Sequence, residues 1–121
     1  MPKTWREACR VDDLTEDVPH IVAFDALEIG LIKHRGTIYA LRNRCTHAGA
    51  PLCKGRIVTP IVSDGPGQRP RFDHDAPPAI SCPWHHWRFD LATGRSLAPV
   101  PKPTVRTYET KIDDGWVYLC L

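Results

Sequence analysis

CTHAGAPL, beginning at Cys45, and CPWH, beginning at Cys82, each pair one cysteine with one histidine. The histidine of the first stretch is His47, and that of the second is His85. Thiolate sulfur and imidazole nitrogen are both strong ligands for transition metals. Because four such ligands complete a closed metal centre, the sequence predicts one centre to which both stretches contribute.

This donor set fits two kinds of centre. Two cysteines and two histidines can hold a tetrahedral zinc ion, or a 2Fe-2S cluster in which two histidines replace two cysteines on one of the irons. Zinc fingers usually pair like ligands, cysteine with cysteine and histidine with histidine, whereas each stretch here mixes the two types. The arrangement therefore favours the cluster, and a structural zinc module is the weaker alternative.

Length and charge limit what the centre can belong to. A chain of 121 residues suits a single domain with its own hydrophobic core. The net charge is only +2 and charged residues make up 25% of the chain, so the composition does not indicate nucleic acid or a membrane surface. No apolar run approaches the roughly 20 residues of a transmembrane helix, and no signal-peptide core follows Met1. We therefore expect a soluble, cytoplasmic protein with no nucleic acid and no membrane partner.

The remaining cysteines do not form a recognisable pattern. The chain has five cysteines, and Cys9, Cys53 and Cys120 are scattered without the spacing of a disulfide framework. Cys53 follows Cys45 closely enough to be mistaken for a metal ligand. A free cysteine most often behaves as a small buried apolar residue, and this is the interpretation that we favour for Cys53.

Short apolar stretches rich in Val, Ile, Tyr and Trp, separated by Gly, Pro and Asp, predict strands rather than helices. The expected strands cover residues 20–24, 27–33, 37–41, 105–112 and 116–119. Turn sequences at residues 34–37 and 113–115 are typical of hairpins. The two ends of the chain therefore belong to one antiparallel scaffold, and the metal motifs lie on loops that it carries.

Residues 59–80 differ in composition from the rest, because they contain five prolines and two glycines. Such a segment is expected to form a long loop rather than a second domain. Within it, Phe72-Asp73-His74-Asp75 combines a histidine with carboxylates. Exposed polar residues are common on proline-rich loops, so a solvated loop is the favoured interpretation of this patch.

Taken together, CTHAGAPL and the longer stretch CPWHHWRFDLATG resemble the ferredoxin-type Rieske domain of bacterial oxygenase systems. The resemblance extends over nearly the whole chain. It implies an all-β fold, with a Rieske-like antiparallel β-sandwich or barrel base domain and an inserted cluster-binding subdomain. A single Rieske 2Fe-2S domain would cover residues 1–121, with the cluster-binding subdomain at about 43–98 and the proline-rich insert at about 59–80.

The resemblance also assigns one Rieske-type 2Fe-2S cluster to the chain. Cys45 and Cys82 would bind one iron, and His47 and His85 the other. Imidazole is a neutral donor, so the histidine-bound iron accepts an electron more easily than an iron in a four-cysteine cluster. Neither iron keeps a position open for a substrate, which implies electron transfer and no catalytic residue.

The partners that this family implies are proteins. The first hypothesis is a ferredoxin that carries one electron at a time from a flavin-dependent reductase to a terminal oxygenase. The second is a small or accessory Rieske subunit of an NAD(P)H-dependent nitrite reductase. In oxygenase large subunits of this family, the Rieske domain is followed by a catalytic domain that holds mononuclear iron. We do not expect that domain here, because the chain ends at Leu121 and its leftover histidines form no credible triad. The oxygenase substrate, the reductase and the oligomeric state stay open.

Several positions depart from the patterns that the family shows. High-potential members carry two extra cysteines that form a disulfide, and this chain has Ala50 and Trp84 at those positions. Such members also carry hydroxyl residues at two positions where this chain has Trp87 and Phe89. His86 stands where the family usually has glycine, and tolerated variation in a loop is its favoured interpretation. A stiff proline-rich stretch, residues 99–103, matches the place of the loop that covers the cluster.

The missing hydroxyl donors lead to a prediction about the redox potential. Hydrogen bonds to cluster sulfur stabilise the reduced state, so their absence lowers the midpoint potential. We expect a value toward the low end of the Rieske range of about −150 to +300 mV. A redox titration followed by visible absorbance measures it, and a midpoint above about +100 mV would contradict the argument.

Overall fold

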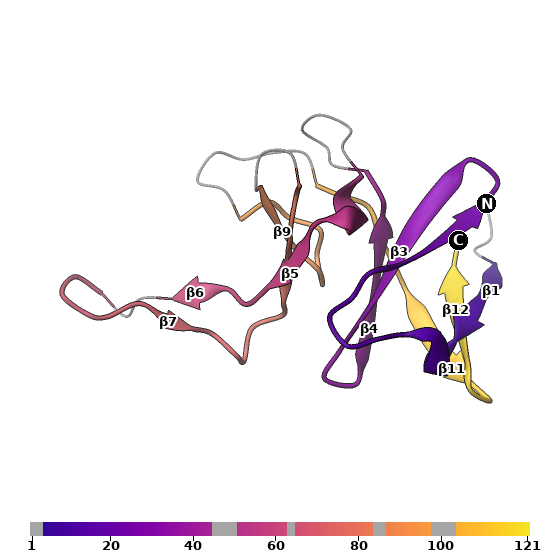
Figure 1. Ribbon diagram of the computed structural model, residues 1–121, viewed down its shortest axis with the longest axis horizontal. Helices are drawn as coiled ribbons and strands as arrows, with labels where there is room; N and C mark the ends of the chain where they lie inside the picture. Colours follow the sequence, from indigo (N-terminus) through magenta and orange to yellow (C-terminus); the bar gives the residue numbers. More distant parts are fainter. Residues whose placement is uncertain (1–3, 45–50, 63–64, 84–86, 98–103) are drawn as a thin grey trace.

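The computed structural model describes residues 4–44, 51–62, 65–83, 87–97 and 104–121 (Figure 1). Within these ranges the chain is almost entirely strand and turn, and its strand pairs are antiparallel. The all-β fold expected from the sequence is confirmed.

Two sheets form the base of the molecule. The first has the order β1-β12-β11 and contains β1 (Trp5–Arg10), β12 (Trp116–Cys120) and β11 (Thr110–Asp113). The second has the order β10-β4-β3-β2 and contains β10 (Thr107–Tyr108), β4 (Thr37–Arg42), β3 (Leu27–His34) and β2 (His20–Phe24). A short 3-10 turn, η1 (Val11–Asp13), follows β1. The chain ends are paired, because the Thr4 and Leu121 backbones exchange hydrogen bonds of 3.0 and 2.9 Å.

The middle of the chain forms two smaller sheets. One has the order β5-β8-β9 and contains β5 (Arg56–Val58), β8 (Ala79–Ser81) and β9 (Arg88–Asp90). The other pairs β6 (Ile61–Val62) with β7 (Arg71–Phe72) and projects from the molecule as an arm (Figure 1). A second 3-10 turn, η2 (Leu52–Lys54), precedes β5 and lies between it and the base sheets (Figure 1).

Both predicted hairpin turns are present. Arg35 and Gly36 have φ values of 50° and 80°, and Asp114 and Gly115 have 51° and 79°. Positive φ at both central residues is the signature of the type I′ turn, whose twist matches that of the flanking strands. These turns join β3 to β4 and β11 to β12.

Several features differ from the sequence-based expectation, among them the strands β5, β8 and β9, which the pattern did not predict. The strand expected at residues 105–112 is divided near Glu109, because β10 pairs with β4 whereas β11 pairs with β12. The N-terminal strand β1 was not among the strands expected from the pattern. The proline-rich segment at residues 59–80 is not only loop, because its β-branched and aromatic residues form the β6–β7 ladder.

The four-stranded sheet is covered on both faces. In β3, Ile29 and Leu31 pack with the three-stranded base sheet through one core cluster, whereas Ile32 packs with the middle segment of the chain through another. In β4, Ala40 and Leu41 divide between the same two clusters. Successive residues of a strand point to opposite faces, so a doubly covered strand must be apolar on both. This requirement explains why the centre of β3, residues 29–32, is apolar and buried on both faces.

Gly30 lies between Ile29 and Leu31 on the face that η2 covers. A Cβ atom added to Gly30 would lie 2.1 Å from the Sγ atom of Cys53 in η2, which is inside any permitted contact. Cys53 itself is 4% exposed. The missing side chain therefore lets η2, which directly follows the first predicted ligand segment, sit against the central sheet.

Because Cys53 is buried, we expect the free energy of unfolding to fall at alkaline pH. Burial, with a smaller contribution from the charge of Glu28, raises the pKa of the Cys53 thiol from 9.0 to about 12. Since the folded-state pKa lies above the unfolded one, this stabilisation is complete below about pH 9 and is lost as the pH rises toward 12. We expect a loss of up to about 4 kcal/mol in the free energy of unfolding across that interval. Denaturant titrations followed by circular dichroism at several pH values measure it.

Cys53→Ala is the matched control for this prediction. It leaves a small cavity and lowers stability at neutral pH, but it removes the titrating group. Its free energy of unfolding should fall less steeply above pH 9 than that of the unmodified chain. Equal slopes for the two proteins would contradict the assignment of the alkaline loss to Cys53.

Candidate metal centre

Of the four predicted ligands, Cys82 lies within the described residues, whereas Cys45, His47 and His85 lie outside them. Cys82 directly follows β8 and is 1% exposed. Its backbone N–H donates a hydrogen bond of 2.7 Å to the carbonyl of Trp87, next to the Ser81–Arg88 pair of the β8–β9 ladder. The ladder therefore holds together the two ends of the segment that contains His85.

The first ligand segment has ends that are joined in a similar way. The side-chain oxygen of Asn43 accepts a hydrogen bond of 2.7 Å from the backbone N–H of Cys53, across the segment that contains Cys45 and His47. The backbone N–H of Asn43 in turn donates to the carbonyl of Glu28 at 2.9 Å, which ties this closure to β3. The role of Asn43 in closing this segment could not be predicted from the sequence, because its partner lies ten residues away and no local motif marks the pair.

The proline-rich segment at residues 99–103 also lies outside the described residues, but its flanks are joined. The backbone N–H of Val105 donates to the carbonyl of Gly94 at 2.9 Å. Gly94 has a φ of 75°, and a Cβ atom there would lie 1.9 Å from the Val105 carbonyl oxygen. Only glycine therefore permits this approach of the two backbones.

Close backbone packing brings the two ligand segments together. A Cβ atom added to Gly55, next to η2, would lie 1.8 Å from the carbonyl oxygen of Ser81, so the backbone beyond the first segment touches the residue before Cys82. One core cluster contains Leu52 and Cys53 from η2 together with Cys82. Segments about 30 residues apart in sequence therefore meet at Cys82.

The surroundings of Cys82 fit a centre of low net charge. Its core cluster is apolar and includes Ile80, Phe89 and Leu91, which are all at most 1% exposed, with Trp87 packed against it. Two ferric ions, two sulfides, two thiolates and two neutral imidazoles sum to zero charge, whereas four thiolates would leave a dianion. A neutral centre loses little solvation in an apolar site, and a dianion would lose much. The predicted donor set and this packing are therefore compatible.

Phe89 and Trp87 share that cluster with the predicted ligand Cys82. These aromatic residues therefore belong to the same core as Cys82. Ala50, Trp84 and His86 lie outside the described residues.

Cys53 is a buried free thiol, as predicted. Its sulfur packs against Gly30 of the central sheet, where a Cβ atom would lie only 2.1 Å from it. Cys9 and Cys120 are also free thiols, and the Asp73-His74-Asp75 part of the insert is exposed apart from the half-buried Asp73.

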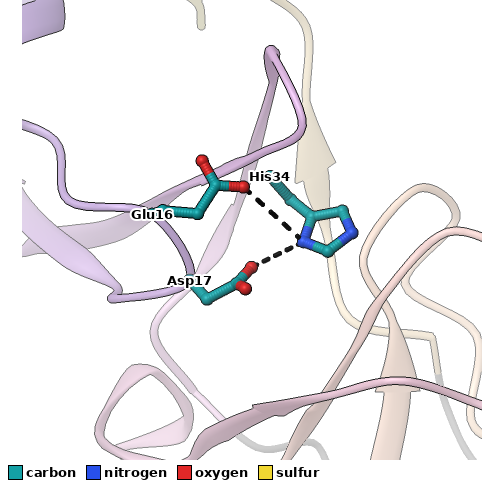
Figure 2. Close-up of side chains that lie close together, drawn as sticks. All are labelled: Glu16, Asp17 and His34. Atoms are coloured by element: carbon teal, nitrogen blue, oxygen red, sulfur yellow. Dashed lines mark hydrogen bonds and ion pairs between the residues drawn. The ribbon is translucent and has the colours of Figure 1, made fainter. Parts of the chain in front are cut away.

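A different histidine–carboxylate group exists in the base domain (Figure 2). His34 Nδ1 lies 2.6 Å from Asp17 Oδ1 and 4.0 Å from Glu16 Oε1. Glu16 Oε1 also accepts a hydrogen bond of 2.6 Å from the backbone N–H of Arg35. These contacts fasten the segment between η1 and β2 to the β3–β4 turn. Glu16 and Asp17 are about half exposed, and their hydrogen bonds give the group a structural role.

Comparison with known proteins agrees with the structural picture. The model of the family described as Rieske [2Fe-2S] domain matches residues 4–109. The ferredoxin component of naphthalene 1,2-dioxygenase/salicylate 5-hydroxylase systems from Ralstonia sp. is 31% identical over 119 residues, covering 98% of this chain and 97% of that protein.

Solved structures resemble this one over almost its full length. The ferredoxin of carbazole 1,9a-dioxygenase from Nocardioides aromaticivorans IC177 has a TM-score of 0.72 and 25% identity, covering 98% of this chain and 97% of that one. A protein described as a putative NADH-dependent nitrite reductase small subunit from Mycobacterium tuberculosis has a TM-score of 0.77 and 20% identity, covering 100% and 97%. The second likeness concerns the fold alone.

The helical turns of the described residues are too short and too polar to cross a membrane. The match of the family model over most of the chain agrees with the antiparallel base sheets and the buried Cys82. The chain therefore belongs to the Rieske [2Fe-2S] domain family, whose cofactor is a 2Fe-2S cluster.

Proposed function

We propose that this chain is a Rieske ferredoxin that carries one electron at a time from a flavin-dependent reductase to a terminal oxygenase. The observation that carries the proposal is the end-to-end likeness to a dioxygenase ferredoxin component, which matches 98% of this chain and 97% of that protein. The protein would act in the cytoplasm.

The ligand set is part of the proposal. Cys45 and Cys82 would bind one iron, and His47 and His85 the other. When bound, the cluster supplies a site that accepts and releases a single electron. The chain itself contributes the apolar cluster that includes Cys82 and the joined ends of the segments that carry the ligands. A carrier with little to rearrange on reduction transfers its electron readily.

The proposal includes the domain organisation. A single domain would cover residues 1–121, with the cluster-binding subdomain at about 43–98. The separate β5-β8-β9 sheet and the β6–β7 arm support such a subdomain, because both form from the middle of the chain alone.

The second candidate function is that of a small Rieske subunit in a nitrite reductase. The observation that favours it is the TM-score of 0.77 with the Mycobacterium tuberculosis protein. The two candidates differ in assembly: a ferredoxin purifies as a free protein, whereas a subunit purifies with a large partner. The stated sequence identities favour the ferredoxin.

A comparison of two cysteine variants tests the ligand set. Cys82→Ser should abolish the cluster, because serine does not replace a thiolate ligand to iron at this site. Cys53→Ala, also buried but outside the ligand set, should retain it. Iron and acid-labile sulfide analysis, with visible and EPR spectra, measures the content. A Cys82→Ser protein with a full complement of iron and sulfide would remove Cys82 from the set, and stoichiometric zinc without sulfide would replace the cluster by a zinc site.

Reconstitution tests the direction of electron flow. The purified protein is mixed with the reductase and the terminal oxygenase of a naphthalene dioxygenase system, and NADH oxidation and product formation are followed. We expect product to depend on this chain, with the Cys82→Ser protein giving at most about 1% of the rate. Failure to support any Rieske oxygenase, together with copurification of a large reductase subunit, would favour the second candidate.

A further inference from the structure

Three positively charged side chains surround a pocket beside the predicted ligand Cys82. Lys54, Arg56 and Arg88 line this pocket of about 340 Å³ together with Cys82 and the adjacent Pro83. All three charged residues are exposed. They come from η2, β5 and β9, so three different elements contribute to what we call the cationic pocket.

The register of the β5-β8-β9 sheet explains why Arg56 and Arg88 line the same pocket. Arg56 and Arg88 are both paired with Ser81 of the middle strand, so their side chains emerge on one face, on either side of β8. The next row, Ile57, Ile80 and Phe89, points into the core. Because successive side chains of a strand point to opposite faces of the sheet, the two arginine side chains point away from the core. Their positions differ by two strand spacings, or about 10 Å.

The cationic side chains are not neutralised by their neighbours. Lys54, Arg56 and Arg88 make no ion pair or hydrogen bond with another side chain in the part of the chain that the structure describes. Asp90 is on the same face as Arg88, two residues along β9, and its Oδ1 atom already accepts hydrogen bonds from the backbone of Ala92 and Thr93.

Cations of the base domain are arranged differently. Four of them lie over aromatic rings of their own domain: Arg6 over Phe24, Arg10 over Trp116, Arg106 over Tyr108, and Lys111 over Trp5 and Tyr118. Such stacking uses the cations within the fold. Those of the cationic pocket have no comparable contact among the described residues and are available to a partner.

The charge of the whole chain is divided in the same way. The segments 42–58 and 79–97 contain six cations and one carboxylate: Arg42, Arg44, Lys54, Arg56, Arg88 and Arg95, with Asp90. Their net charge of +5, against +2 for the whole chain, leaves −3 for the remainder. The small total therefore conceals a dipole whose positive end includes the surroundings of Cys82.

We infer that the cationic pocket receives carboxylate side chains of the protein with which this chain exchanges electrons, so that this partner presents an acidic surface to it. The inference rests on the proposed function, because it concerns the face beside the proposed cluster. A local field of one sign raises the rate of encounter with an oppositely charged partner, and the gain falls as salt increases. Nucleic acid is less favoured as the occupant, since three cations around one pocket do not make the extended basic stripe that a phosphate backbone requires.

Two redox acceptors of opposite charge test the field. The dithionite-reduced protein is mixed in a stopped-flow instrument with ferricyanide, an anion, or with cytochrome c, a cationic protein, and each receives one electron from the cluster. Replacement of Lys54, Arg56 and Arg88 by glutamine should lower the rate of electron transfer to ferricyanide about tenfold at low ionic strength. The same replacement should raise the rate of electron transfer to cytochrome c. The difference should shrink as salt is added.

The matched control changes the net charge equally but elsewhere. It replaces Arg6, Arg10 and Lys111 of the base domain by glutamine, and its rates with both acceptors should stay within about twofold of the unmodified chain. Equal effects of the two triple variants would show that only net charge matters, and no effect of the pocket variant would remove the pocket from the encounter. Either result overturns the inference.

A binding measurement without electron transfer completes the test. A short oligo-aspartate peptide, titrated calorimetrically, should bind the unmodified chain, with an affinity that falls as salt increases, and should bind the pocket variant at least about tenfold more weakly. Tighter binding of a DNA duplex than of the peptide would overturn the inference in favour of nucleic acid. The iron and sulfide content of every variant distinguishes a failure of the proposed function from a failure of the inference. Absence of the cluster from the unmodified chain contradicts the proposed function, whereas an intact cluster with no effect of the pocket variant contradicts the inference alone.

Discussion

The contact of the turn η2 with the strands on either side of it is the constraint on which the rest of the structure depends. On one side, the sulfur of Cys53 fills the space that a side chain at Gly30 would occupy. On the other, Gly55 brings the backbone against the carbonyl of Ser81. Both approaches require the absence of a Cβ atom, so two glycines set the distance between the base sheet and the subdomain that carries Cys82.

This packing makes the central sheet an interior layer. Its strands carry apolar residues on both faces, one set toward the outer base sheet and the other toward η2 and the β5-β8-β9 sheet. A layer held on both sides is a rigid support, because close-packed interiors resist deformation. The ligand-bearing segments rest on it with their ends joined, at Asn43 with Cys53 and at Cys82 with Trp87. Rigid support suits a carrier that gains and loses an electron without other chemistry.

Charge is distributed along the same division of the molecule. The base domain holds most of the carboxylates and stacks four of its cations on its own aromatic rings, whereas the cations near Cys82 face outward. Carriers must bind their partners briefly, and long-range attraction speeds encounter without requiring tight contacts. An alternating strand pattern achieves this at no cost to the core, since Arg56 and Arg88 directly precede Ile57 and Phe89, whose side chains point to the opposite, core-facing side of the sheet.

The sequence by itself predicted the donor set, and it determined the all-β class and the two hairpin turns, because these depend on local residue types: thiolate and imidazole spacing, period-two apolar runs, and Arg-Gly or Asp-Gly at a turn. It did not reveal β1, the division of the last strands between two sheets, or the β6–β7 ladder, because pairing partners far along the chain decide them. The roles of Gly30, Gly55 and Asn43 are also set by distant neighbours. The overall charge of +2 concealed the cationic pocket for the same reason: composition sums charges, and only the fold places them on one face.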